Sequence, residues 1–407
     1  MGIRFDVIVV GAALNGLTAG LALGGHRTKR PLSIAIVDIR DPRLAASFDH
    51  DARASAITAS SKRMLEALGV WEHVGQHAQE MREIIVTDGV DHDNLPVLLQ
   101  FGESASSASL VENHHLLEGL LAVVEKSPSI TLLTGHGVVE QSYAPGLAKL
   151  TLANGEQLSG SLVVAADGGK SPIREAAHIE LVGWTCEQMG IVASFDHELP
   201  HHGRAEEHFT PAGPFAILPL PGNRSSIVWT KGTVEAKKLL SLSHQDFETE
   251  LQKEIGSHLG TITLIGKPRG YPLSMFFAKE FHGTRLALVG DAAHVIHPLA
   301  GLGLNLGLRD VAALAECVAE ANALGQDIGG LAVLERYSTW RRFDTVATAA
   351  GMDGLNRLFS NSNPFLRIMR DLGLRATNQL SGLKQTFARE AAGQTGSLPR
   401  LLRGENV

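Results

Sequence analysis

The stretch LALVGDAAHVIHPLAGLGLNLGLRDVAAL, residues 286–314, says more about the fold than any other part of the chain. Its apolar start, 286–289, predicts a buried strand that ends at Gly290-Asp291, and from Leu304 onward apolar side chains repeat at the spacing of an amphipathic helix. A carboxylate beside a helix N-terminus can bind a polar, partly anionic ligand, because hydroxyls donate to it and the first helical N–H groups are unpaired. We therefore expect a ligand site here.

The N-terminus contains a second unit of this kind. Residues 5–10 (FDVIVV) predict a strand, 11–16 (GAALNG) a tight turn before a helix, and the apolar run 34–37 another strand that ends at Asp38. Strand, glycine turn, helix, strand and acid in this order are typical of a dinucleotide-binding unit. The alternative is an ordinary βαβ turn whose glycines serve only helix–strand packing.

Four residues of this unit are expected at the nucleotide. Asp38 would bind a ribose, and Gly11 and Gly16 would seat the pyrophosphate at the helix start. Ala13 stands where the middle glycine of G-x-G-x-x-G usually lets the backbone approach the pyrophosphate. This departure predicts either weaker binding or a shifted pyrophosphate.

A third segment favours a flavin nucleotide. Residues 162–166 predict a buried strand that leads into DGGKSPIR at 167–174. With it the chain resembles the group A flavoprotein monooxygenases of the p-hydroxybenzoate hydroxylase fold, which share an N-terminal glycine motif, A-D-G-x-x-S-x-x-R and G-D-A-A-H-x-x-x-P. The second motif is matched by Ala166, Asp167, Gly168, Ser171 and Arg174, and the third by Gly290, Asp291, Ala292, Ala293, His294 and Pro298.

Six further segments narrow this resemblance to the FAD-dependent hydroxylases of ubiquinone biosynthesis, most of all the 2-polyprenylphenol 6-hydroxylases. The segments are 51–57, 111–113, 213–220, 227–229, 271–273 and 393–404. The resemblance implies an α/β fold in which a Rossmann-like FAD-binding domain is interleaved with a smaller β-sheet substrate domain and followed by a helical C-terminus. The implied ranges are 1–75, 110–180 and 275–340 for the FAD-binding domain, 76–109 and 181–274 for the substrate domain, and 341–407 for the C-terminal segment.

The resemblance also assigns cofactor contacts. Arg53 would reach the flavin phosphate or ribityl chain, unless it is a surface arginine, and Asn113 and Asp291 would bind the middle of the cofactor. Asp167 and Arg174 would contact cofactor and nicotinamide, or else only brace a loop. The expected cofactor-binding residues are Gly11, Ala13, Gly16, Asp38, Arg53, Asn113, Asp167, Gly168, Gly290, Asp291, Pro298, Gly301, and the start of a helix aimed at the isoalloxazine, Gly303, Leu304 and Asn305.

The implied reaction leaves the difficult chemistry to FAD, and no catalytic dyad or triad is visible. NAD(P)H, docking transiently, reduces the flavin; O2 forms a flavin C4a-hydroperoxide; the distal oxygen attacks a prenylated phenol. His294 and His297 are weak acid–base candidates, with loop packing the favoured alternative. The candidate pocket walls, for which plain sheet core is an even alternative, are Phe215, Ile217, Leu218 and Trp229.

Composition argues against several other classes. The chain has 407 residues, 44% of them hydrophobic, and a formal net charge of −7, which argues against a nucleic-acid partner. Two cysteines without C-x-x-C spacing argue against a thiol redox pair, and adjacent histidines such as His114-His115 and His201-His202 argue against a metal site because neighbouring side chains diverge. With no leader-like segment and no apolar run of about 18 residues, the expected compartment is the cytoplasm.

Three rival functions stay open: hydroxylation of a soluble phenol, flavin reduction without oxygen insertion, and a flavin-fold scaffold subunit of a ubiquinone-biosynthesis complex. Two departures suggest the scaffold function: Ala13 replaces a glycine, and Leu302 stands where close relatives usually carry glutamine. The tail from 365 to 403 carries seven Lys and Arg residues against two acidic ones. This excess suits peripheral contact with the inner membrane face or with a partner, and equally a solvated helix face.

Overall fold

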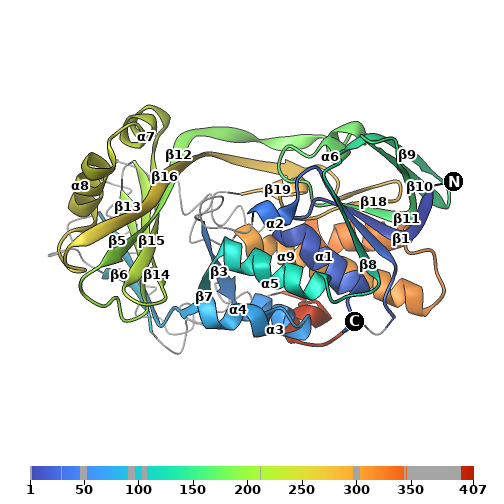
Figure 1. The fold of residues 1–407 in the computed structure, drawn as a ribbon, viewed down its shortest axis with the longest axis horizontal. Coiled ribbons are helices and arrows are strands. Elements are labelled where there is room, and N and C mark those ends of the chain that lie inside the picture. The colour runs from blue at the N-terminus through green and yellow to red at the C-terminus, as the bar shows by residue number, and fades with distance from the viewer. Residues whose placement is uncertain are drawn as a thin grey trace.

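The structure, a computed structural model, describes residues 2–28, 30–45, 53–89, 97–102, 108–210, 212–296, 303–342, 345 and 396–407. Figure 1 shows an elongated molecule with a sheet toward each end, joined by two long strands, β12 (Leu181–His197) and β16 (Ile262–Ala278). Each of these two sheets has eight described strands.

The first sheet is mostly parallel. β1 (Ile3–Val10) pairs in parallel with β2 (Ile34–Asp38) and β11 (Gln157–Ala165), while β8 (Ile130–Thr134) extends the sheet beside β2 and β18 (Leu286–Leu288) beside β11. Because these five strands run the same way, the three motifs that follow β1, β11 and β18 meet at one edge. Antiparallel strands complete the sheet: β9 (Val138–Ala144), β10 (Leu147–Leu152) and β17 (His282–Gly283).

Helix α1 (Leu14–Gly24) lies against α5 (Asn113–Val124) and α9 (Gly303–Ala323) beside this sheet (Figure 1). The glycines of α1 allow it to lie close to β2. A Cβ on Gly20 would come 2.5 Å from Ile36 Cδ1. Helix cover on a parallel sheet explains why its strands read as continuous apolar runs.

The second sheet has the strand order β19-β16-β12-β15-β14-β13-β5-β6. Helices α7 (Thr233–Leu240) and α8 (His244–Ile255) cover one of its faces (Figure 1). The shorter strands are β5 (Glu83–Asp88), β6 (Val97–Phe101), β13 (Arg204–Thr210), β14 (Gly213–Leu220), β15 (Arg224–Gly232) and β19 (His294–Val295).

The strands of each sheet can be set against the expected domain ranges. Every strand of the first sheet lies within the ranges expected for the FAD-binding domain. In the second sheet, β16 runs past residue 275, and β19 lies entirely beyond it. The long ribbon of β12 and β16 therefore belongs to both halves of the molecule.

Aromatic side chains form the core between the second sheet and its helices. Trp229 meets Phe215 and Phe247 of α8 edge-on, with ring centroids 5.7 and 6.2 Å apart. Ile217 and Ile227 belong to the same buried cluster. Because side chains alternate along a strand, the residues between them face the other way.

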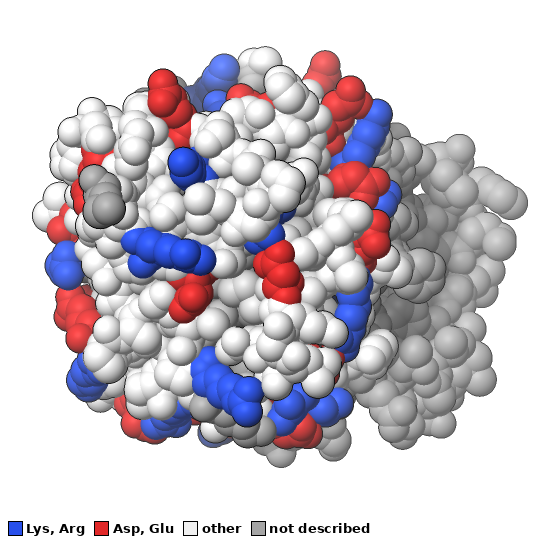
Figure 2. All heavy atoms as spheres, turned by 90° about the vertical axis from the view of Figure 1, so that its right-hand side faces the viewer, with Lys and Arg blue, Asp and Glu red and all other residues white. Residues whose placement is uncertain are grey.

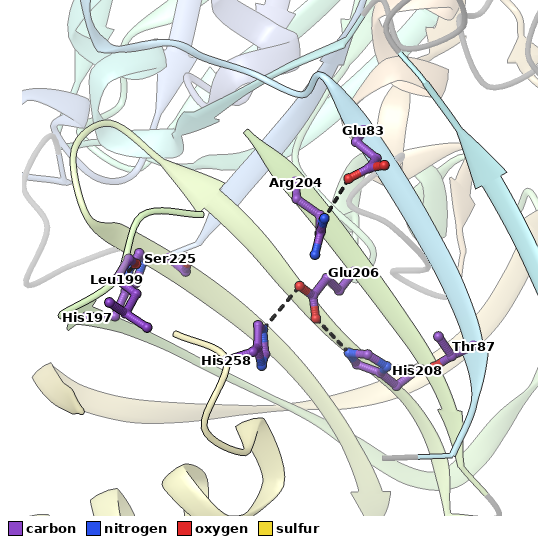
Figure 3. A network of polar contacts seen from close by, with 9 residues as sticks. All are labelled: Glu83, Thr87, His197, Leu199, Arg204, Glu206, His208, Ser225 and His258. Atoms are coloured by element: carbon purple, nitrogen blue, oxygen red, sulfur yellow. Dashed lines mark hydrogen bonds and ion pairs between the residues drawn. The ribbon is translucent and has the colours of Figure 1, made fainter. Parts of the chain in front are cut away.

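A buried acid–histidine network stabilises the outer strands of this sheet (Figure 3). Glu206 contacts His208 Nε2 and His258 Nε2, both at 3.1 Å, and His208 Nδ1 lies 2.7 Å from Thr87 Oγ1. Burial alone would raise the pKa of Glu206, but the two histidines hold it well below its usual value. Glu207 faces the opposite side of the sheet, where burial raises its pKa to about 7.

The remaining sheet and several helices are short. A third sheet contains β3 (Ala54–Thr58), β7 (Ala108–Glu112) and β4 (Gln79–Glu80). The short helices are α2 (Pro42–Ala45), α3 (Ala59–Ala67), α4 (Trp71–Val74), η1 (Gly75–His77), α6 (Pro172–Ala176) and η2 (Gly290–Ala292).

The last described residues pack against the half of the molecule that contains the first sheet. The short helix η4 (Arg400–Arg403) packs against α3 and α9, and Arg63 Nε donates to the Leu402 carbonyl at 3.0 Å. Most of the basic tail lies outside the described residues. Within them, no helix combines the length and apolarity needed to cross a membrane. On the face drawn in Figure 2, basic and acidic side chains are interspersed.

We predict that Phe247→Ala lowers the free energy of unfolding by about 3–5 kcal/mol, because it removes a fully packed ring from the core under α8. Urea unfolding followed by circular dichroism measures the change. Val234→Ala on the neighbouring helix is the control, since Val234 is 85% exposed and should cost less than about 0.5 kcal/mol. Equal losses for the two variants would contradict the prediction.

Candidate functional site

A cavity of about 690 Å³ lies at the carboxyl edge of the first sheet and is lined by residues from both large sheets. Its volume is in the usual range for small-molecule and cofactor sites. Three expected residues, His297, Pro298 and Gly301, lie outside the described part of the chain. The expected residues that line the cavity are Ala13, Asp38, Arg53, Asn113, Gly168, Asp291, His294, Gly303 and Leu304.

The turn after β1 requires two of its glycines. Gly11 has a φ of +110°, and a Cβ there would lie 2.3 Å from the carbonyl oxygen of Ala166. A Cβ on Gly16 would lie 1.8 Å from the carbonyl oxygen of Gly11. Ala13, by contrast, has an ordinary φ of −86° and lines the cavity, so alanine causes no backbone strain here.

The start of α1 is open toward the cavity. Its N-cap, Ala13, makes no side-chain hydrogen bond to the first turn. Beside it, Asp38 accepts hydrogen bonds from Ala12 N at 2.7 Å and from Arg40 N at 2.9 Å, one on each oxygen. These bonds hold the carboxylate in place, and each oxygen keeps a second lone pair for a ligand hydroxyl. The pair suits an anion at the helix start and a hydroxyl at Asp38.

Arg174 connects the second motif with the third. Its buried guanidinium donates to the carbonyl oxygens of Ala292 and Gly169, both at 3.0 Å. This geometry matches the loop-bracing alternative for Arg174. Asp167 accepts from Ile173 N at 3.2 Å through Oδ2. Its Oδ1 is buried without a hydrogen-bond partner among the described residues, and burial raises the pKa of its carboxyl.

Asp291 and Arg53 line the cavity from the half of the molecule that contains the first sheet. Desolvation of its carboxyl by the surrounding residues raises the pKa of Asp291. The charges of His294 and Arg53 act in the opposite direction. The Arg53 guanidinium lies 5.2 Å from the ring centre of Tyr271 on β16. This cation–π contact joins the two walls of the cavity.

A buried ion-pair cluster supports the third motif from behind. Asp310, on α9, accepts from Gly290 N at 3.0 Å, contacts His294 Nε2 at 2.6 Å, and accepts from Arg341 Nε at 2.8 Å. Burial would raise the pKa of Asp310, but His294 and Arg341 lower it below its usual value. His294 therefore lines the cavity while its Nε2 is held by the buried Asp310.

The two asparagines expected at the cofactor are both anchored to β3. Asn305 does not line the cavity; its amide accepts from Thr58 N at 3.0 Å and donates to the Ala56 carbonyl at 2.7 Å. Asn113 lines the cavity, and its Oδ1 accepts from Ser55 Oγ at 2.7 Å. Asn305 thus positions the start of α9, whereas Asn113 can also meet a ligand.

The second sheet contributes a wall that the sequence analysis did not identify. Phe215, Ile217 and Trp229 lie on the helix-covered face, and Leu218 packs in a separate cluster against β3 and β7. These four residues are therefore sheet core and not cavity wall, because alternate side chains of a strand face opposite sides. The residues of this sheet that do line the cavity are Gly190, Val192, Ser226, Val228, Arg269, Tyr271, Pro272, Leu273 and Ser274, together with His294 and Val295 of β19.

One acid–histidine group adjoins the cavity through His114, which lines it. Glu112, His114 and His115 each place a potential metal-ligating atom within 4.8 Å of the others. The rings of His114 and His115 have centroids 4.0 Å apart, so these neighbouring side chains do not diverge as the sequence argument assumed. Glu112 already accepts from Arg224 at 3.0 Å, and His115 contacts Glu118 at 3.2 Å. We assign no metal to the group.

Comparison with known proteins identifies the family. The family model described as "FAD binding domain" matches residues 4–349. The chain is 38% identical to Ubiquinone hydroxylase UbiL of Rhodospirillum rubrum over 98% of this chain and 92% of that protein. It is 32% identical to 3-demethoxyubiquinol 3-hydroxylase of Escherichia coli over 95% and 98%. The chain therefore belongs to the family of proteins built on this FAD-binding domain.

A solved structure supports the fold. The chain resembles p-nitrophenol 4-monooxygenase PnpA of Pseudomonas putida with a TM-score of 0.81 and 18% identity, over 98% of this chain and 100% of the other. The predicted α/β fold of the p-hydroxybenzoate hydroxylase type is confirmed. The site also fits the family's cofactor: FAD carries hydroxyls for Asp38 and Asp291 and a pyrophosphate for the open start of α1.

We predict that Asp310→Asn lowers the free energy of unfolding at neutral pH by about 3–5 kcal/mol, because it leaves buried Arg341 and His294 without their counter-charge. The pKa of Asp310 is depressed in the folded protein, so its contribution is present above about pH 4 and disappears as pH falls through the depressed value. The difference in unfolding free energy between wild type and variant should therefore become smaller at acid pH. Urea titrations over a pH series measure it. The exposed Asp196→Asn is the control, and a gap independent of pH would contradict the charge argument.

Proposed function

We propose that this protein is an FAD-dependent, NAD(P)H-using monooxygenase that hydroxylates the aromatic ring of a polyprenyl phenol in ubiquinone biosynthesis. The observation that carries the proposal is one cavity lined by the three cofactor motifs on one side and by a face of the second sheet on the other. The names of the similar hydroxylases from Rhodospirillum rubrum and Escherichia coli support the substrate class.

The first wall of the cavity would hold the cofactor. The open start of α1 would bind the pyrophosphate, Asp38 a ribose hydroxyl, and Asp291 the hydroxyls of the ribityl chain. When bound, FAD supplies the electron transfer from NAD(P)H and the activation of O2. Gly303 at the start of α9 also lines the cavity, so the positive end of this helix would stabilise negative charge on the bound ring.

The second wall would hold the substrate. Val192, Val228 and Leu273 offer apolar contact to an aromatic ring and exclude water around it. Tyr271 lies on the same wall, and a tyrosine hydroxyl can hydrogen-bond a phenolic oxygen. Orientation of the ring, rather than a strong acid or base, is the contribution expected of this wall.

The decisive experiment measures oxygen transfer. Purified protein with FAD and NAD(P)H should incorporate one labelled oxygen atom from ¹⁸O2 into a prenylated phenol, and a deletion strain should accumulate the unhydroxylated precursor. Oxidation of NAD(P)H without label in the product would indicate a flavin reductase. Equal activity on a phenol that lacks the prenyl chain would favour a soluble substrate. Protein that stays colourless with added FAD would favour a scaffold.

We predict that Val228→Trp raises KM for the phenol at least about ten-fold while FAD affinity stays unchanged, because the larger side chain fills the substrate side of the cavity. Steady-state kinetics and flavin fluorescence separate the two effects. Val234→Trp, at an 85% exposed position of α7, is the matched control and should leave KM unchanged. A parallel loss of FAD affinity in the cavity variant would argue against a separate substrate wall.

We also propose that the protein works in the cytoplasm and docks peripherally on the inner membrane face through its basic tail, because a prenylated substrate resides in the bilayer. Converting Arg367, Arg370 and Arg375 to glutamine should weaken binding to phosphatidylglycerol vesicles by about 1 kcal/mol per charge removed. Vesicle co-sedimentation measures this loss. In the matched control, the exposed Arg4, Arg30 and Arg82 are converted to glutamine instead. Unchanged binding in the tail variant would contradict the docking proposal.

A further inference from the structure

One ion pair connects the third sheet with the second. Glu112 ends β7 of the third sheet, Arg224 begins β15 of the second, and Arg224 Nη2 donates to Glu112 Oε1 at 3.0 Å. The side chain of Glu112 is only 5% exposed. Neither residue is among those that line the cavity. The pair therefore lies outside the ligand site and joins two parts of the protein.

Glu112 is fixed among residues of the wall proposed to hold the cofactor, the cofactor wall. It pairs in register with Ala54, which lines the cavity. The next residue, Asn113, also lines the cavity, and its N–H donates to the Arg53 carbonyl at 2.9 Å. Although Glu112 is the N-cap of α5, its side chain makes no hydrogen bond to that helix. Its carboxylate instead accepts from Arg224 of the other sheet.

Arg224 belongs to a strand of the wall proposed to hold the substrate, the substrate wall. Along β15, Arg224 shares a face with Ser226 and Val228, because side chains alternate, and both of these residues line the cavity. Asp196, on the neighbouring strand β12, is a more distant carboxylate. Its Oδ1 lies 4.0 Å from Arg224 Nε, and its side chain is 58% exposed. Glu112 is thus the closer and more buried partner of the guanidinium.

The two sheets also share an apolar cluster. Ala56 and Leu110 of the third sheet pack with Ala216 and Leu218 of the second. Apolar burial is non-directional, whereas a charge-assisted hydrogen bond fixes both a distance and a direction. The ion pair can therefore set a relative position that the apolar cluster alone would leave variable.

We propose that Glu112 and Arg224 form a positioning pair that sets the distance between the cofactor wall and the substrate wall, and thereby the share of NAD(P)H that is used for hydroxylation. This inference rests on the proposed function. In coupled turnover, NAD(P)H, one proton, O2 and the phenol give NAD(P)+, water and the hydroxylated phenol. In uncoupled turnover, NAD(P)H, one proton and O2 give NAD(P)+ and hydrogen peroxide, and the phenol is unchanged. Both reactions consume the same two electrons, so a misplaced ring changes the products without stopping NAD(P)H oxidation.

The test compares full-length, FAD-loaded wild type, Glu112→Leu, Arg224→Leu, the double variant and Arg224→Lys. Each single leucine variant should lower the hydroxylated product formed per NAD(P)H at least about three-fold, with hydrogen peroxide making up the difference. The Kd for FAD, measured by flavin fluorescence, should change less than about two-fold, because neither side chain lines the cavity. A readout without turnover is the change that the phenol causes in the flavin absorbance spectrum, which should become smaller in the same variants.

Two further variants separate positioning from general stability. The double variant should lose no more product per NAD(P)H than either single variant, because all three remove the same hydrogen bond. Arg224→Lys should retain most of the product, since its ammonium keeps the charge and a donor for Glu112. If Glu112→Leu fails to fold, the comparison of Arg224→Leu with Arg224→Lys decides the question.

The matched control is an ion pair within the second sheet, in which Arg204 Nε lies 2.7 Å from Glu83 Oε2 (Figure 3). Arg204→Leu should leave the product per NAD(P)H unchanged. An equal loss in this control, additive losses in the double variant, or a lower melting temperature as the only change in the single variants would overturn the inference. Wild-type protein that forms no hydroxylated phenol would overturn the proposed function itself, which distinguishes the two failures.

Discussion

The close approach of β1 and β11 at their carboxyl ends is the constraint on which the candidate site depends. Gly11 N donates to the Val37 carbonyl at 2.7 Å, and Ala166 N donates to the Val10 carbonyl at 2.8 Å, so backbone pairing continues past the last strand residues. A side chain at position 11 would collide with the Ala166 carbonyl. Because the chain turns within this narrow space, α1 begins directly at the sheet edge and its open N-terminus meets the cavity. The third motif shares the cavity because β18 pairs in parallel with β11.

Buried charges support this edge from the protein side and leave the cavity side open. Arg174 satisfies two loop carbonyls, and Asp310 joins Gly290 N, His294 and Arg341. Isolated buried charges would be strongly destabilising, whereas these are paired or hydrogen-bonded.

The second sheet divides stability and binding between its two faces. The face under α7 and α8 contains the aromatic cluster of Phe215, Trp229 and Phe247. The opposite face presents Val192 and Val228 to the cavity. Strands β12 and β16 reach into both halves, and the Arg53–Tyr271 contact joins the walls across the cavity. Substitutions on the face under α7 and α8 should thus change stability, and substitutions on the cavity face should change ligand binding.

The sequence by itself determined the parallel strands and the order of the three motifs, because these follow from local periodicity. It also placed glycines at positions 11 and 16, but the collision of a side chain at position 11 with Ala166 appears only in the tertiary structure. It also identified Asp38 and Asp291 as carboxylates at strand ends. Only the tertiary structure decided that Arg174 braces a loop, that Asn305 binds β3, and that Val228 rather than Trp229 meets the cavity. Alternation along a strand shows which residues share a face. Which face the helices cover, and which one a ligand meets, depends on packing between segments far apart in the chain, and no local pattern contains that information.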